Sequence, residues 1–245
     1  MLYKIENLHI LSKGYLLSKV LNARRVKALE TTETYSFVNS FSYFALQENS
    51  HKYSLTGLFV DGIFLSVLLN LRYKYKIERA SFDYGSIAFD VLTFATTNNF
   101  SIGIIGAEEE ELNVAIDRII KRFPTLNISY SRNGYNLDNH IDNISDTLRQ
   151  QSVDILILGL GAPLQEEYAT KFGKIHNLKL IFTCGGFLTQ LAESESYYPY
   201  LINKYNLRWL YRIVKHRHVR RKFFKYYPHF FIKFLYLWLA GRRSQ

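Results

Sequence analysis

The sequence predicts an α/β fold in which a Rossmann-like, mostly parallel sheet carries helices on both faces and a basic, aromatic-rich helical appendage follows. Between residues 102 and 184, short strands that are apolar throughout alternate with helical segments, as in parallel sheets covered on both faces. Residues 201–245 contain twelve Lys or Arg and no Asp or Glu, which sets this end apart. We therefore expect an α/β domain over residues 1–200 and the appendage over residues 201–245.

The predicted elements follow from local pattern. Residues 102–106 form an apolar run that ends in glycine, and four acids at 108–111 precede a helical pattern at 112–123. Acidic residues in a first helical turn complement the positive end of the helix dipole. The alternation continues with strand 127–131, helix 139–151, strand 154–160, helix 165–176 and strand 178–184. Nearer the N-terminus, residues 54–60 resemble a strand and residues 62–70 a buried helix or strand.

Composition excludes several classes of protein. Hydrophobic residues make up 48% of the chain and aromatic residues 16%, which a disordered chain would not have. The single cysteine, Cys184, excludes an intrachain disulfide and a zinc site made of four thiolates. We expect no secretory signal and no spanning helix, because no uncharged apolar run reaches about 18 residues.

The charge is concentrated in the appendage. Residues 1–200 carry 19 basic and 21 acidic groups, a net charge of −2, whereas residues 201–245 carry +12. An anionic partner is therefore expected, namely a lipid surface, a nucleic acid or a phosphorylated substrate. Residues 226–240 resemble an interfacial membrane segment with Trp and Tyr at its boundary, although a helix packed on the body is an open alternative. We expect no nucleic acid, because no helix-turn-helix or RNA-binding pattern is present.

Glycines and polar residues end three of the predicted strands, at residues 103–106, 159–166 and 184–186. In a doubly wound sheet the ligand lies beyond the carboxyl ends of the strands. Glycine lets a ligand approach the backbone there, and free amides at a helix start favour phosphate. Ordinary turn chemistry is the alternative. The dinucleotide fingerprint is absent, because Pro163 and Gln165 stand where its later residues would be.

Five ordered motifs can be recognised, of which GLGAPLQEEY at residues 159–168 is the most specific. The others are VDGI at 60–63 with Asn39 upstream, GIIGA at 103–107, NGY at 133–135 and LRWLYR at 207–212. Together these motifs resemble those of the WecG/TagA/CpsF glycosyltransferases, which are grouped as glycosyltransferase family 26. The resemblance covers roughly residues 35–225. The chain departs from the family's pattern at Phe37, where a threonine is usual, and at Arg208, where the family has glutamate.

This resemblance implies transfer of a sugar from a UDP-sugar to a glycan acceptor carried on a polyprenyl diphosphate, in cell-surface polysaccharide synthesis. It also implies inversion at the anomeric carbon without a metal or other cofactor. Inverting transfer needs a general base, and Asp61 is the carboxylate at the family's base position. Asn39 and Arg212 complete the predicted catalytic set. Capping of the next helix is the alternative role for Asp61, and the separation of Asp61, Asp83 and Asp90 in the sequence gives no metal-binding cluster.

The resemblance also implies where the donor and its phosphates bind. The donor-binding residues are then Gly106, Tyr135, Gly159, Gly161, Pro163, Gln165, Glu166 and Gly185. For Tyr135 we consider stacking on uracil or simple packing, and for Gln165 and Glu166 donor contact or helix capping. The departing diphosphate needs cations or amides, and planar guanidinium groups fit phosphate well. The predicted phosphate or membrane contacts are Arg217, Arg220, Arg221 and Lys222.

Two function classes follow from these observations. The first is a glycosyltransferase on the cytoplasmic, inner face of the cell membrane, whose partners are a UDP-sugar, a polyprenyl-diphosphate-linked acceptor and an anionic lipid surface. The second is a basic nucleotide- or nucleic-acid-binding module without transferase activity. The identity of the sugar and the oligomeric state do not follow from the sequence.

Overall fold

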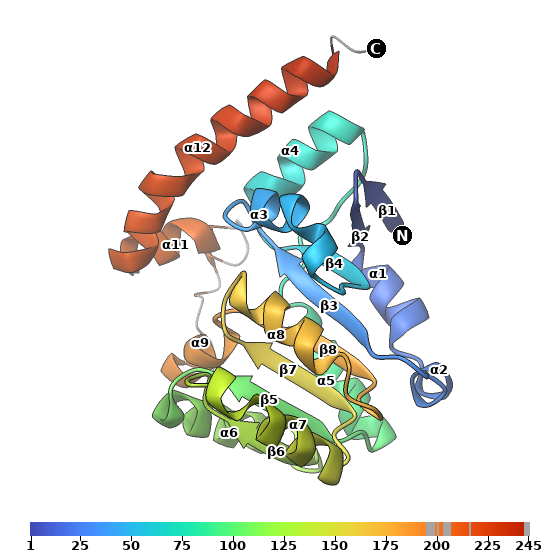
Figure 1. Ribbon diagram of the computed structural model, residues 1–245. Coiled ribbons are helices and arrows are strands. Elements are labelled where there is room, and N and C mark those ends of the chain that lie inside the picture. Colours follow the sequence, from blue (N-terminus) through green and yellow to red (C-terminus); the bar gives the residue numbers. More distant parts are fainter. Residues whose placement is uncertain (195–198, 200, 203–206, 216, 243–245) are drawn as a thin grey trace.

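A single sheet organises the chain (Figure 1). The computed structural model describes residues 1–194, 199, 201–202, 207–215 and 217–242, without the side chains of 208, 212, 218, 219, 222 and 240–242. Within these residues eight strands lie in the order β1-β2-β4-β3-β8-β7-β5-β6. The pair β1–β2 is antiparallel and the other neighbouring pairs are parallel. The predicted mostly parallel α/β sheet is confirmed.

The predicted strand and helix units from residue 102 onward all form. The strands are β1 Leu2–Ile5, β2 Leu8–Leu11, β3 Glu33–Val38, β4 Gly57–Val60, β5 Ile102–Gly106, β6 Ile128–Arg132, β7 Ile155–Gly159 and β8 Leu180–Thr183. The α-helices are α1 Lys13–Tyr15, α2 Ala23–Lys27, α3 Tyr43–Glu48, α4 Ile63–Tyr73, α5 Ile87–Asn98, α6 Glu109–Arg122, α7 Ile141–Gln150, α8 Leu164–Phe172, α9 Phe187–Glu193, α11 Arg208–Lys215 and α12 Arg217–Arg242. The segment 62–70, for which helix and strand were both open, forms the N-cap and the first eight residues of α4.

Strand residues alternate between two covered faces of the sheet. Ile104 of β5 is buried in a cluster with α5, α6 and α9, whereas its neighbour Ile105 is buried in a cluster with α7 and α8. Over the β1–β4 part of the second face lie α3, α4 and α12. Each fully buried aliphatic side chain contributes about 1.5–3 kcal/mol. Burial on both faces explains why these strands are apolar throughout instead of alternating with polar residues.

The appendage is docked on the body through one face of α12. Phe230 and Phe234 of α12 are only 2% and 1% exposed, and they pack in a cluster with residues of α3 and α4. The guanidinium carbon of Arg72 lies 5.7 Å from the centre of the Phe234 ring. Lys233 forms an ion pair with Glu48. The predicted helical appendage therefore contributes to the hydrophobic core.

The other face of α12 is apolar and open. Its exposed large side chains include Ile232, Leu235, Tyr236 and Leu239, each more than half exposed. The alternative in which this helix packs on the body is confirmed, while membrane contact of its apolar outer face stays a prediction. Among the described residues, no helix has the length and apolarity needed to cross a bilayer.

Candidate active site

Two adjoining cavities lie at the carboxyl ends of the parallel strands. The first encloses about 680 Å³ and the second about 480 Å³. Gly161, Gly185 and Gly186 line both of them, so the two cavities meet at the loops that follow β7 and β8. This is the edge of the sheet at which α/β proteins bind ligands. Two of the three glycine-rich strand ends noted in the sequence, at 159–166 and 184–186, therefore meet at one cleft.

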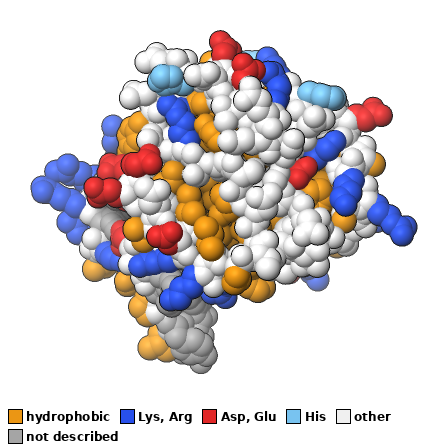
Figure 2. Space-filling view, turned by 90° about the horizontal axis from the view of Figure 1, so that it is seen from below, with side chains coloured by type: hydrophobic (Ala, Val, Ile, Leu, Met, Phe, Trp, Pro, Cys, Tyr) orange, Lys and Arg blue, Asp and Glu red, His pale blue; other side chains and the backbone are white. Residues whose placement is uncertain are grey.

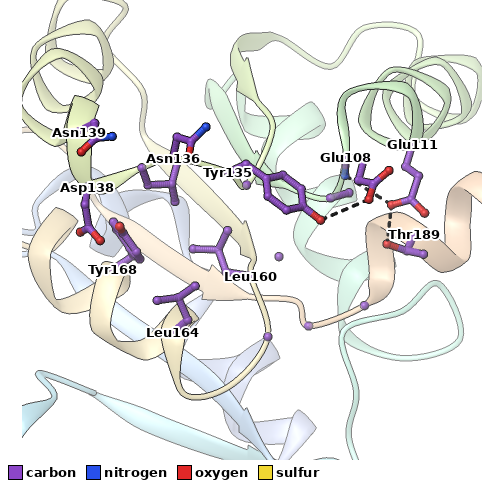
Figure 3. Close-up of a pocket in the computed structure, with 17 residues that line it drawn as sticks. Glu108, Glu111, Tyr135, Asn136, Asp138, Asn139, Leu160, Leu164, Tyr168 and Thr189 are labelled. Carbon is purple, nitrogen blue, oxygen red and sulfur yellow. Dashed lines mark hydrogen bonds between the residues drawn. The ribbon is translucent and has the colours of Figure 1, made fainter. Parts of the chain in front are cut away.

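The first cavity is lined largely by polar side chains from the loops after β5 and β6 (Figure 3). Tyr135 is 56% exposed there, and its hydroxyl donates a hydrogen bond of 3.4 Å to Oε1 of Glu108. The Glu108 carboxylate raises the pKa of Tyr135. Thr189 donates to Oε2 of Glu111 over 2.9 Å. The interpretation of Tyr135 as a packed side chain is wrong, because the ring stands open in the cavity.

Glycine at two strand ends shapes the backbone between the cavities. Gly106 has a φ of +154°, and a Cβ placed on it would lie 2.6 Å from the carbonyl oxygen of Gly159. Gly106 therefore permits close contact between β5 and β7, although it lines neither cavity. Gly161 has a φ of +76° with no atom near its missing side chain. The backbone of Gly161 is therefore open to a ligand. It has a conformation that residues other than glycine rarely adopt.

Gln165 and Glu166 belong to a hydrogen-bond network beneath this loop. The backbone N–H of Gly185 donates to Oε1 of Gln165 over 3.1 Å, and the Gln165 side chain lines the second cavity. Glu166 has no exposed surface, and its Oε1 accepts from Ser36 at 2.6 Å and from Nε2 of Gln165 at 2.9 Å. Burial raises the pKa of Glu166. Glu166 thus lies beneath the loop and lines neither cavity, while Gln165 reaches the cleft.

Asp61 lies in the second cavity and is held by an ion pair. Nη2 of Arg79 donates to Oδ1 of Asp61 over 3.2 Å and also to Oγ of Ser81 over 3.0 Å. Ser81 in turn donates to Asp83. The first position of α4 is capped by Gly62 without a side-chain hydrogen bond. The alternative in which Asp61 caps this helix is therefore wrong, and its carboxylate faces the cleft.

Arg79, Ser81 and Asp83 were not found from the sequence as site residues. They follow β4 and α4 in an irregular segment with no motif spacing, so only the fold brings them beside Asp61. Asp83 lines the same cavity as Asp61, whereas Asp90 forms an ion pair with Lys13 at 2.7 Å elsewhere. Within the described part of the chain, no three His, Cys, Asp or Glu side chains gather in a way that could hold a metal ion.

Asn39 lies at the rim of the second cavity beside Asp61, because it follows Val38 of β3, which pairs with Val60 of β4. Its Oδ1 accepts from the backbone N–H of Phe41 over 2.9 Å and from that of Ser42 over 3.3 Å. This turn fixes the loop between β3 and α3, and Asn39 itself lines the cavity with Asp61. Its amide group donates no hydrogen bond within the described residues. The structure thus brings the predicted Asn39 and Asp61 together in one cavity.

The appendage closes one side of the second cavity with large side chains, most of which are aromatic. Trp209 and Ile213 of α11 and Phe223, Tyr226 and Tyr227 of α12 line it. Nothing in the sequence distinguished these rings from the many other aromatic residues of the appendage. They show that α11 and α12 take part in the cleft as well as in the core.

The predicted cationic residues lie mainly on the surface of the appendage. Arg217, Arg220 and Arg221 are exposed on α12 and line neither cavity. The side chains of Arg212 and Lys222 lie outside the described residues, although their backbone belongs to α11 and α12. Figure 2 shows Lys and Arg side chains at its left margin, the side on which α11 and the start of α12 lie in Figure 1.

The mostly parallel sheet and the two-part cleft at the carboxyl ends of its strands define an α/β protein that binds a ligand at this edge. The model of the glycosyl transferase WecG/TagA/CpsF family matches residues 10–244, and the chain belongs to this family.

Two relatives show how closely the chain resembles proteins with assigned activities. A UDP-Gal:alpha-D-GlcNAc-diphosphoundecaprenol beta-1,4-galactosyltransferase from Shigella boydii is 40% identical over 222 residues, which cover 89% of this chain and 90% of the relative. An N-acetylglucosaminyldiphosphoundecaprenol N-acetyl-beta-D-mannosaminyltransferase from Staphylococcus aureus is 25% identical over 123 residues, about half of each chain.

Proposed function

We propose that the protein transfers galactose from UDP-galactose to N-acetylglucosamine linked to a polyprenyl diphosphate, with inversion and without a metal ion, in the synthesis of a cell-surface polysaccharide. The galactosyltransferase relative, which matches nearly the whole chain at 40% identity, supports this donor and acceptor. The observation that carries the reaction type is the position of Asp61 in a cavity that continues into the polar first cavity.

The donor is proposed to bridge both cavities. Its uridine lies in the first cavity, where Glu108 and Glu111 accept hydrogen bonds from hydroxyl groups and the open ring of Tyr135 offers a stacking surface. A cavity with these acidic side chains suits hydroxyl groups better than phosphates. The diphosphate lies against the glycine backbone that both cavities share, and the sugar reaches the second cavity. Arg212 of α11, whose side chain lies outside the described residues, is the residue proposed to stabilise the departing diphosphate.

Asp61 is the proposed general base. It takes the proton of the attacking acceptor hydroxyl, the acceptor oxygen forms a bond with the anomeric carbon, and the bond from that carbon to the UDP oxygen breaks. The proton then rests on Asp61 and the electron pair leaves with UDP. The ion pair with Arg79 fixes the orientation of the carboxylate. Asn39, at the end of the neighbouring strand β3, contributes its amide group to substrate positioning.

The outer face of α12 is the proposed attachment to an anionic membrane on the cytoplasmic side, where the acceptor lipid is held. Exposed apolar residues such as Ile232 and Tyr236 enter the interface, and the exposed Arg217, Arg220 and Arg221 contact lipid phosphates. Basic residues near such a surface contribute about 1 kcal/mol each. We expect Ile232→Glu combined with Tyr236→Glu to abolish flotation with anionic vesicles. Flotation equal to that of the parent would contradict this attachment.

The reaction is tested by incubating the protein with UDP-hexoses and UDP-N-acetylhexosamines, each with an N-acetylglucosaminyl diphosphate lipid, with and without EDTA. We expect a β-linked galactosyl product whose yield EDTA leaves unchanged. Faster transfer from a UDP-N-acetylhexosamine would refute the proposed donor, and loss of activity in EDTA would refute metal independence. The melting temperature of the protein is measured with UDP and with oligonucleotides as well. A rise with oligonucleotides but not with UDP would instead favour the nucleic-acid-binding module.

A further inference from the structure

Aromatic rings from the body and from the appendage meet at one rim of the second cavity. Phe41, in the loop between β3 and α3, makes an edge-to-face contact with Tyr226 of α12, with ring centres 6.3 Å apart. Trp209 of α11 lies against Phe223, with ring planes inclined by 19°, and against Phe64, with ring centres 5.0 Å apart. The proposed reaction does not yet use these rings.

The rings are fixed in position and yet open. Phe41 is 39% exposed and Tyr226 is 44% exposed, although both line a cavity. The Asn39 side chain holds the backbone of Phe41 through its hydrogen bond of 2.9 Å. Phe223 and Phe64 both contact the Trp209 ring. Open aromatic surfaces with fixed orientation bind a flat partner at little cost in conformational entropy.

We propose that Phe41, Trp209 and Tyr226 form the subsite for the acceptor sugar, by stacking on the apolar face of its pyranose ring. This inference rests on the proposed transferase function. A pyranose has one face of C–H groups and a rim of hydroxyls, which complements the negative face of an aromatic ring. The same cavity presents Asp61, Arg79 and Asn39 to the hydroxyl rim.

Geometry assigns these rings to the acceptor and not to the donor. The donor reaches the second cavity past the shared glycines, and an inverting attack comes from the side opposite to the departing UDP. The rings lie on the side built by the appendage, whose outer face we place at the membrane that holds the acceptor. If the hydrocarbon chain of the acceptor lipid occupied this cavity instead of the sugar, the polar side chains of the cavity would lose their hydrogen-bond partners, at a cost in free energy.

A binding measurement tests this subsite without relying on catalysis. Trp209 and Trp238 are the two tryptophans of the chain, so Trp238→Phe makes Trp209 the sole tryptophan reporter. This variant is titrated with a short-chain lipid N-acetylglucosaminyl diphosphate and with the same lipid diphosphate lacking the sugar. Phe41→Ala is compared with Phe89→Ala, a matched control on α5 that is also 39% exposed and lines neither cavity.

We expect Phe41→Ala to raise the Kd of the sugar-bearing compound about tenfold, while the Kd values of the sugar-free compound and of UDP stay within about twofold. Phe89→Ala should change none of them. Equal weakening of both lipid compounds, or no weakening, would overturn the proposal. Should Phe41→Ala fold poorly, Phe41→Leu applies the same test with less loss of volume. Selective binding of the sugar-bearing compound without transfer from any UDP-sugar would reject the proposed function and leave the subsite intact.

Discussion

Replacement of Phe234 by alanine tests whether docking of the appendage is needed for activity. Phe234 is 1% exposed, packs in one cluster with Leu65 and Leu69 of α4, and lies beneath the Arg72 guanidinium group. Loss of a buried Phe ring costs about 3–5 kcal/mol. Since about 1.4 kcal/mol is a factor of ten, 3 kcal/mol lowers the ratio of docked to undocked α12 more than a hundredfold.

Undocking removes Tyr226 and Tyr227 from the cleft, so we expect Phe234→Ala to lose most transfer activity even in detergent, where membrane attachment plays no part. The assays are galactosyl transfer, thermal unfolding and hydrogen exchange of α12. Tyr236→Ala is the control, because this side chain lies on the same helix and is 70% exposed. Similar activity and exchange in Phe234→Ala and Tyr236→Ala would refute the docking argument.

Further predictions concern the network around the cleft. Arg79→Met should lower kcat about tenfold or more while UDP binding is kept, because Asp61 loses its ion-pair partner; unchanged kcat would contradict this. Burial raises the pKa of Glu166 above its unfolded value, so its contribution to stability is complete at acid pH and is lost as the pH rises toward the folded pKa. In Glu166→Gln, the melting temperature should therefore depend less on pH over the range in which Glu166 loses its proton. A pH dependence equal to that of the parent would contradict this. Tyr135→Ala should raise the Kd of UDP measured by calorimetry, because the stacking surface for uracil is lost. A Kd equal to that of the parent would contradict the stacking role of Tyr135.

The parallel part of the sheet could be predicted because its strands are buried on both faces and follow one another at regular intervals. The runs at 102–106 and 154–160 became β5 and β7 within about a residue at each end. The N-terminal half was harder, because β1 and β2 form a short antiparallel pair at the sheet edge and lack such runs. Its only local signal is the alternation of Tyr3, Ile5, Leu8 and Ile10 with exposed residues, which extends over two strands of four residues each.

The cleft was only partly predictable. Asp61 and Asn39 lie in recognisable motifs at strand ends, and the fold brings them into one cavity. Arg79 lies in the irregular segment after α4 and belongs to no recognisable motif. Only its contact with Asp61 in the folded chain places it in the cleft. Glu166 matched the family pattern, yet burial of its carboxyl group depends on Ser36 of a neighbouring strand. Contacts of this kind depend on strand order, which the sequence does not show.

The measurement that tests the account most directly compares sugar transfer with UDP binding in Asp61→Asn. The amide keeps the shape of the carboxylate but cannot take the acceptor proton. We predict that transfer falls about 10²-fold or more while the Kd of UDP stays nearly unchanged. Asp90→Asn, which alters a carboxylate outside the cleft, should keep parental activity. Parental transfer by Asp61→Asn would contradict the role of Asp61 as the base, and a large loss of UDP affinity would place Asp61 in the donor site instead.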